Sequence, residues 1–176
     1  MSYLHLFWWS YDGTWKSHDG VYFNLTLIYF NYILINLQFK SHPEKPERIK
    51  RILESLKEKR LYERCGNLEA RLALDEELEL THDLNYVNSL KVLKSKTREE
   101  LIALSKNPDS VYFHFDTFEC AKLAAGSVLS IVDAVCNNKF TNGVAISRPP
   151  GHHANSNACS GFCFFNSIAV SLLGLI

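Results

Sequence analysis

The sequence predicts an α/β fold in which a parallel β-sheet is flanked by helices. Several segments have the 3.6-residue apolar periodicity of amphipathic helices. One short apolar run, GVAISR at residues 143–148, has the composition of a buried strand. The order helix, strand, loop, helix along residues 116–176 is typical of folds whose strands run parallel. In such folds the chemistry gathers where loops leave the C-terminal ends of strands.

The first forty residues differ in amino-acid composition from the rest of the chain. Residues 21–39, VYFNLTLIYFNYILINLQF, contain no charged residue and are long enough to cross a bilayer. Asn, Thr and Gln side chains interrupt this stretch, and each is costly in hydrocarbon. The aromatic and aliphatic composition therefore favours a pair of buried strands with a turn at Asn31, and a membrane span is the less favoured alternative. No signal peptide is predicted, since a compact basic start and short apolar run are missing.

Charged helical segments begin after Lys40. One predicted helix has an apolar face at positions i, i+3, i+4 and i+7, which are Ile49, Ile52, Leu53 and Leu56. Pro46 lies near the first turn of this helix, where a missing N–H costs nothing. Residues 75–95 predict one or two helices with a break near His82. TREELIALSK predicts another, which ends at the Asn-Pro pair that follows it.

Residues 116–137 predict the clearest helix of the chain. The small residues Ala124, Ala125 and Gly126 on it suggest a close approach to the sheet. A turn follows, and residues 143–148 then predict a central strand. NSIAVSLLGLI predicts a new helix with its N-cap at Asn166 or Ser167.

The amino-acid composition limits the kinds of protein to which this chain can belong. The chain has 176 residues, enough for one domain of ordinary size. Lys plus Arg (19) equals Asp plus Glu (19), so net charge gives no argument for a nucleic-acid partner. The five cysteines are odd in number and irregular in spacing, which indicates reduced thiols in an intracellular protein. The sequence leaves the nucleus and the cytoplasm equally open as the location.

The stretch RPPGHHANSNACSGFCFFN, residues 148–166, is the strongest chemical signal. Pro149 and Pro150 stiffen the exit from the predicted strand, and Gly151 permits a sharp bend. His152 and His153 are therefore held by the backbone next to each other. Two adjacent imidazoles can share one reaction, in which one accepts a proton from water and the other stabilises developing charge.

Two other interpretations compete for this loop. His152, His153, Cys159 and Cys163 are all residue types that bind zinc. However, neighbouring histidines rarely face one ion, and the spacing C-x3-C is looser than the usual C-x2-C. The histidines could also have no chemical role. An acid–base pair remains the favoured interpretation.

The same loop resembles the signature of the zinc-dependent histone deacetylases, especially their class IIb members. SHPEKPERIKRILESL, THDLNYVNSL, DSVYFHFDTFECAKLAAGSVLSIVDAV and NGVAISRPPGHH are similar to the same family in the same order. The resemblance extends over residues 41–176, the N-terminal part of the family's catalytic domain. It implies a partial arginase/deacetylase-like fold, and hydrolysis of N-acetyl-lysine with the help of zinc.

The resemblance also implies roles for individual residues. His153 corresponds to the general base and acid, and His152 to its electrostatic partner. The substrate-binding positions of the family are Asp109, Ser110, Gly161 and Phe162. Of these, Asp109 and Ser110 lie at the rim, Gly161 meets the acyl-lysine through its carbonyl, and Phe162 forms one tunnel wall. Arg48 corresponds to an arginine of the cavity through which acetate leaves. His82 with Tyr86 is a family pattern that is interpreted as structural packing.

The family's zinc ligands are not found in this sequence by motif. In the family they follow later, as an Asp-x-His pair and a further Asp. We therefore expect no metal at the family site in this chain, and no deacetylase activity of the chain alone. Residues 1–40 also depart from the family and are predicted to be foreign to it, whereas residues 41–176 form the deacetylase portion.

The expected partners are acetylated lysine side chains of histones or other proteins, with no direct contact to nucleic acid or membrane. A non-catalytic acetyl-lysine-binding or regulatory remnant is the main alternative function. A membrane-anchored remnant that uses residues 21–39 is another. The sequence does not choose among histone, tubulin-like and polyamine substrates.

Overall fold

The computed structural model describes residues 23–27, 44–106 and 110–174 of the chain. Their order along the chain is β1 (Phe23–Leu27), α1 (Glu47–Glu58), the 3-10 helix η1 (Tyr62–Arg64), β2 (Cys65–Asn67), α2 (Asp75–Glu79), α3 (Leu84–Lys91), the 3-10 helix η2 (Val92–Ser95), α4 (Arg98–Leu104), α5 (Thr117–Cys136), β3 (Asn142–Ile146) and α6 (Ser167–Leu173).

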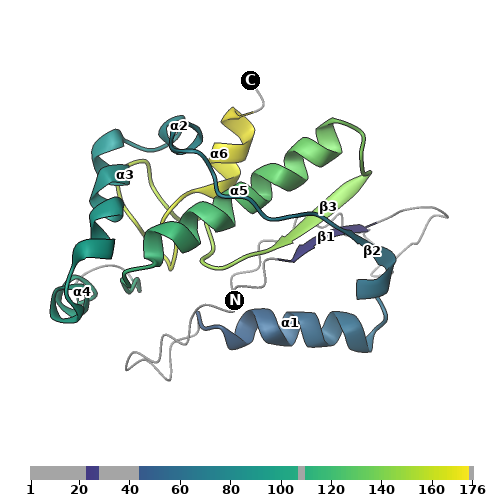
Figure 1. The fold of residues 1–176 in the computed structure, drawn as a ribbon, viewed down its shortest axis with the longest axis horizontal. Helices are drawn as coiled ribbons and strands as arrows, with labels where there is room; N and C mark the ends of the chain where they lie inside the picture. Colours follow the sequence, from purple (N-terminus) through teal and green to yellow (C-terminus); the bar gives the residue numbers. More distant parts are fainter. Residues whose placement is uncertain (1–22, 28–43, 107–109, 175–176) are drawn as a thin grey trace.

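The described strands form one parallel sheet in the order β2-β1-β3. Phe23 of β1 aligns with Cys65 of β2 and with Asn142 of β3. The sheet lies between α5 on one face and α1 on the other (Figure 1). This arrangement confirms the predicted α/β class with helices flanking a parallel sheet. The prediction of a central strand at residues 143–148 was wrong for the described sheet, because β1 occupies the centre and β3 an edge.

The predicted helices are present with small shifts of their ends. Pro46 immediately precedes α1, and the break near His82 separates α2 from α3. The side chain of Asn166 accepts a hydrogen bond from the backbone N–H of Ala169 at 3.1 Å, so the N-cap of α6 is Asn166 rather than Ser167. That bond satisfies one of the free N–H groups of the first helical turn.

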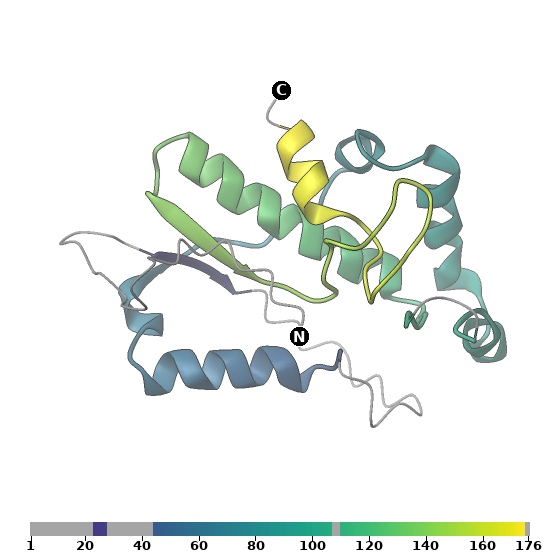
Figure 2. The ribbon, with the colours of Figure 1, turned by 180° about the vertical axis from the view of Figure 1, so that it is seen from behind.

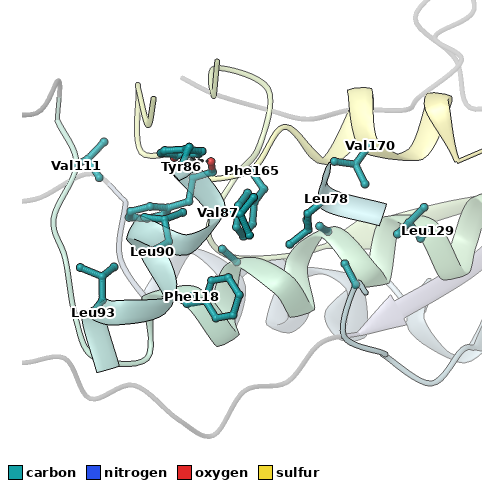
Figure 3. Packing of buried hydrophobic residues seen from close by; sticks show 14 of the residues in the cluster. Leu78, Tyr86, Val87, Leu90, Leu93, Val111, Phe118, Leu129, Phe165 and Val170 are labelled. Carbon is teal, nitrogen blue, oxygen red and sulfur yellow. Dashed lines mark hydrogen bonds between the residues drawn. The ribbon is translucent and has the colours of Figure 1, made fainter. Parts of the chain in front are cut away.

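The main core lies where α3, α5 and α6 meet the loop that follows β3. Figure 3 shows Leu78, Tyr86, Val87, Phe118, Phe165 and their neighbours interdigitating there. Phe165 is almost fully buried and packs edge-on against both Tyr86 and Phe118. The loop is thus one wall of the core, so its backbone is fixed by apolar packing as well as by hydrogen bonds.

Gly126 of α5 allows a very close contact with another segment of backbone. A Cβ added at Gly126 would lie 2.1 Å from the carbonyl oxygen of Arg71 and 2.5 Å from the backbone nitrogen of Ala73. The backbone that follows β2 therefore runs directly over the helix. The helix as a whole packs against β3 and β1 of the sheet, as predicted, and Gly126 additionally allows this connecting segment to lie against it.

The first forty residues are described only in β1. The predicted second strand and the turn at Asn31 lie outside the described residues. Within residues 23–27, 44–106 and 110–174, no helix combines the length and the apolar character that a membrane crossing requires.

Candidate functional site

The loop between β3 and α6, residues 147–166, is called the histidine loop below. It leaves the C-terminal end of β3 and folds back beside α3 before α6 begins (Figure 2). Hydrogen bonds of backbone groups join parts of this loop to one another and to α3 with the turn that precedes it. The predicted position of the tandem histidines just beyond a parallel strand is therefore observed.

His152 and His153 lie with their ring centroids 4.1 Å apart and their planes inclined by 50°. His153 is exposed, whereas His152 is half-buried. Burial, and secondly the neighbouring His153, lower the pKa of His152 below that of a free imidazole. Among the described residues, the buried Nδ1 atom of His152 has no hydrogen-bond partner. The neutral imidazole of His152 therefore lies behind the exposed imidazole of His153.

A tight turn places the next predicted residues against this pair. Ser160 and Cys163 exchange two backbone hydrogen bonds of 3.1 and 2.9 Å across Gly161 and Phe162. The φ angles of those two residues are +50° and +71°, as in a type I′ turn. A Cβ at Gly161 would lie 2.8 Å from Cδ2 of His153, so glycine is required there for both conformation and space.

Phe162 borders a small pocket, which we call the Arg148 pocket. It has a volume of about 30 Å³, room for one or two water molecules. Its lining comes from the segment before α1, the segment before α5, α5 itself and the histidine loop: Glu44, Ser110, Tyr112, Thr117, Cys120, Arg148, Pro149, Phe162 and Phe164. Two predicted substrate-binding residues, Ser110 and Phe162, thus meet at one pocket.

A buried ion pair fixes the start of the histidine loop. The Nε atom of Arg148 donates to Glu44 at 2.9 Å, and the side chains of Arg148 and Glu44 are only 10% and 6% exposed. Arg148 also donates to the hydroxyl of Tyr112. Burial raises the pKa of Tyr112 to about 12, so this hydroxyl stays protonated near neutral pH.

Arg48 lies on α1 beside this ion pair. Its Nη2 atom donates to the carbonyl oxygen of Ser147 at 2.7 Å, and its Nε atom is 3.6 Å from Glu44. The guanidinium therefore holds the backbone at the exit of β3. Ser110 is exposed and has a φ of +53°. Asp109, the other predicted rim residue, lies outside the described residues.

Sequence reasoning missed Glu44, Tyr112 and Arg148 as parts of the site. Glu44 stands in the same SHPEKPER stretch that supplied Arg48, and Arg148 stands directly before the two prolines. The only available signal was a charged residue directly after a buried strand. A charge in that place needs a partner, but the partner lies 104 positions away in the sequence.

The described residues do not fit a catalytic zinc, which needs three protein ligands. No group of three or more His, Cys, Asp or Glu side chains gathers among them in a way that could hold a metal ion. Burial raises the pKa of Cys159 and Cys163, which disfavours the thiolate form that zinc requires. The thiol of Cys163 is directed at the carbonyl oxygen of Gly161, 3.3 Å away. All five cysteines of the chain are free thiols.

Comparison with known proteins shows which family has a similar sequence. Residues 42–176 match the family model described as the histone deacetylase domain. The chain is 47% identical over 126 residues to polyamine deacetylase HDAC10 of Rattus norvegicus, a match that covers 72% of this chain and 21% of that protein. It is 39% identical over 140 residues to histone deacetylase 6 of Caenorhabditis elegans, covering 77% and 15%.

A solved structure has a similar fold. The crystal structure of the HDA15 HD domain superposes with a TM-score of 0.72 at 25% identity, over 87% of this chain and 42% of that one. The chain spans about a fifth of the length of the curated relatives that it matches most strongly, such as the rat protein at 21%.

Proposed function

The chain belongs to the histone deacetylase family, as its sequence predicted, and from this premise we propose that it supplies the acid–base part of a site that hydrolyses acetylated amines. The observation on which this proposal rests is the pair His152 and His153, with ring centroids 4.1 Å apart, at the C-terminal end of a parallel strand. A proton carrier is needed in amide hydrolysis at both steps, when water attacks and when the amine leaves.

The two imidazoles have different environments and therefore different proposed roles. His153 is exposed, so it can accept a proton from the attacking water and later donate it to the leaving nitrogen. The C–N bond of the amide breaks, a C–O bond forms, and acetate and the free amine result. His152, whose lowered pKa keeps it neutral, stabilises the charge that develops on its neighbour.

The remaining predicted roles are part of the same proposal. Phe162 and Gly161 form one wall of the acyl-lysine tunnel, which is supported by their position against His153 and the Arg148 pocket. Ser110 and Asp109 hold the substrate at the rim. Arg48 borders the path of acetate, near Ser147 and Glu44. The family is zinc-dependent, and zinc would polarise the acetyl carbonyl, although the described residues form no group that could hold it.

The proposed substrates are acetylated lysine side chains of histones or other proteins. Acetylated polyamines are the second candidate, because the rat, human and mouse relatives are named polyamine deacetylases. We also propose an intracellular location, in the nucleus or cytoplasm, which the five free thiols support.

The proposed division of the chain places residues 41–176 in the deacetylase portion and gives residues 1–40 a separate origin. The start of the family match at residue 42 supports it. Deletion of residues 1–40 is the test, with soluble yield and circular dichroism as readouts. Because this deletion removes β1 from the middle of the sheet, loss of folding would show that the segment is an integral part of the domain.

The function is tested with a hybrid enzyme, in which residues 42–176 replace the matching segment of the rat relative. We expect zinc-dependent deacetylation of an acetyl-lysine peptide or an acetylated polyamine, and His153→Ala should lower kcat about 10²–10⁴-fold. Asn157→Ala, an exposed change in the same loop, is the matched control. A folded hybrid without turnover, or one that tolerates His153→Ala, contradicts the proposal and favours a non-catalytic binding role. The 176-residue chain alone is expected to be inactive.

A further inference from the structure

His82, in the turn between α2 and α3, uses both of its ring nitrogens. Its Nδ1 atom is 3.2 Å from the carbonyl oxygen of Ser156, and its Nε2 atom is 2.9 Å from the backbone nitrogen of Asn166. A carbonyl can only accept and a backbone N–H can only donate. The contacts therefore require a neutral ring with hydrogen on Nδ1. The residue is 3% exposed, and burial lowers its pKa, which keeps the ring neutral.

The two contacts of His82 join two distant parts of the histidine loop, since Ser156 and Asn166 are ten positions apart in it. Neighbouring groups add to this attachment. The backbone N–H of Asp83 donates to the same carbonyl of Ser156 at 2.9 Å. The hydroxyl of Tyr86 donates to the carbonyl of Phe164 at 2.8 Å. The turn before α3 and the first turn of α3 thus bind the loop at three residues.

Asn166 extends the connection to the tandem histidines. Its side-chain amide nitrogen donates to the carbonyl oxygen of Ala154 at 3.1 Å, and its amide oxygen caps α6 through the N–H of Ala169. Ala154 directly follows His153. Two hydrogen bonds therefore lead from the buried ring of His82, by way of Asn166, to the backbone next to the proposed general base.

We propose that His82 is a positioning residue whose neutral imidazole clamps the histidine loop and so sets the place of His153. The inference rests on the proposed function of His153 and goes beyond it. It also differs from a packing role. Packing alone would need only the ring contacts of His82 with Tyr86 and Phe165, at centroid distances of 5.7 and 5.2 Å, which any aromatic ring could make.

Two substitutions separate a clamp from packing. His82→Phe keeps an aromatic ring against Tyr86 and Phe165 but removes both hydrogen bonds. His82→Gln loses the ring but supplies one donor and one acceptor. The first readout is amide hydrogen exchange in the 176-residue chain. We expect His82→Phe to lower protection of the Asn166 amide about tenfold, the effect of one net hydrogen bond, while α5 stays protected and His82→Gln retains most loop protection. The reverse ranking overturns the clamp.

Acidification provides a second test, which can be carried out even if the His82→Phe variant does not fold. Protonated His82 cannot accept from the N–H of Asn166. The groups that face this ring are the carboxylate of Asp83, the Tyr86 phenol and the apolar ring of Phe165. As pH falls, the protection factor of the Asn166 amide should drop before those of α5 in the native chain and stay level in His82→Gln. An identical response of the two proteins contradicts the proposal.

Turnover of the hybrid enzyme is the third readout. We expect His82→Phe to lower kcat about tenfold with KM changed less than about twofold, since substrate contacts remain while the base is displaced, and His82→Gln to restore most of kcat. Equal kcat in the Phe variant and the parent overturns the positioning role. If the hybrid itself is inactive, the proposed function fails, whereas hydrogen exchange still decides whether His82 clamps the loop.

Discussion

The two ends of the histidine loop are held by different kinds of interaction. At its start, Arg148 is fixed by a buried charge, the carboxylate of Glu44, and by the hydroxyl of Tyr112. At its end, the carbonyl of Phe164 and the N–H of Asn166 are held by the neutral groups of Tyr86 and His82. The start is attached to the segment before α1, and the end to α3 and its preceding turn.

This difference predicts how much stability is lost when one interaction is removed from each end of the loop. Removal of one partner from a buried ion pair leaves an uncompensated charge in a medium of low polarity, and that is strongly destabilising. Removal of one neutral hydrogen bond costs much less, because the lost group leaves only a dipole unsatisfied. Removal of one partner should therefore cause a large loss of stability at the start of the loop, whereas removal of one hydrogen bond at the end should cause a small one.

The largest expected effect is at the start of the loop. Glu44→Ala should lower the free energy of unfolding by about 3–5 kcal/mol, because Arg148 stays buried without its carboxylate. Urea unfolding of the 176-residue chain measures this. Glu54→Ala, which removes an exposed ion pair with Arg51 of 3.4 Å, is the control and should cost less than about 0.5 kcal/mol. Equal losses for the two variants would show that the buried ion pair stabilises the chain no more than the exposed one.

A change between the two ends should have the next largest effect. Gly161→Ala should cost about 2 kcal/mol, since alanine is strained at a φ of +50° and its Cβ would displace the ring of His153. The measurement is urea unfolding, with the histidine ring signals in NMR to report the displacement. Gly174→Ala, at a φ of −70°, is the control without backbone strain. An unshifted His153 signal in Gly161→Ala would contradict the contact.

At the end of the loop we expect a smaller loss. Tyr86→Phe removes the bond to the Phe164 carbonyl but keeps the ring in the core, so it should cost about 1–2 kcal/mol. Thermal unfolding measured beside Glu44→Ala tests the ranking. If Tyr86→Phe destabilises the chain as much as Glu44→Ala does, the two ends are held equally strongly.

The smallest effect is that of mild acid on the end of the loop. Burial lowers the folded-state pKa of His82 below the value of about 6.5 for an unfolded histidine. The unfolded chain then binds more protons, so the contribution of His82 to stability is complete above about pH 6.5 and declines as pH falls toward its folded pKa. Urea midpoints at a series of pH values should fall less steeply in His82→Gln than in the native chain. Parallel curves would exclude His82 as a source of acid sensitivity.

Local patterns of the sequence predicted much of the fold. The apolar spacing from Ile49 to Leu56 predicted α1, and the run at residues 116–137 predicted α5 almost to its ends. The helix that begins after Asn166 was predicted, with Asn166 as one of two candidate N-caps. These features depend on contacts between residues a few positions apart, so periodicity and capping preferences are sufficient to find them. The motif around His152 and His153 likewise predicted the family, since its residues are contiguous.

Only the tertiary structure decided how this loop is held. Glu44 and Arg148 are 104 positions apart, and His82 and Asn166 are 84 apart. Nothing local distinguishes Glu44 from the exposed glutamates of α1, or the hydrogen-bonded ring of His82 from one that only packs. The place of β1 between β2 and β3, and the backbone that lies against Gly126, are also products of long-range pairing. Hydrogen bonds and ion pairs depend on where atoms meet in space, and that is set by the packing of whole elements rather than by their local sequence.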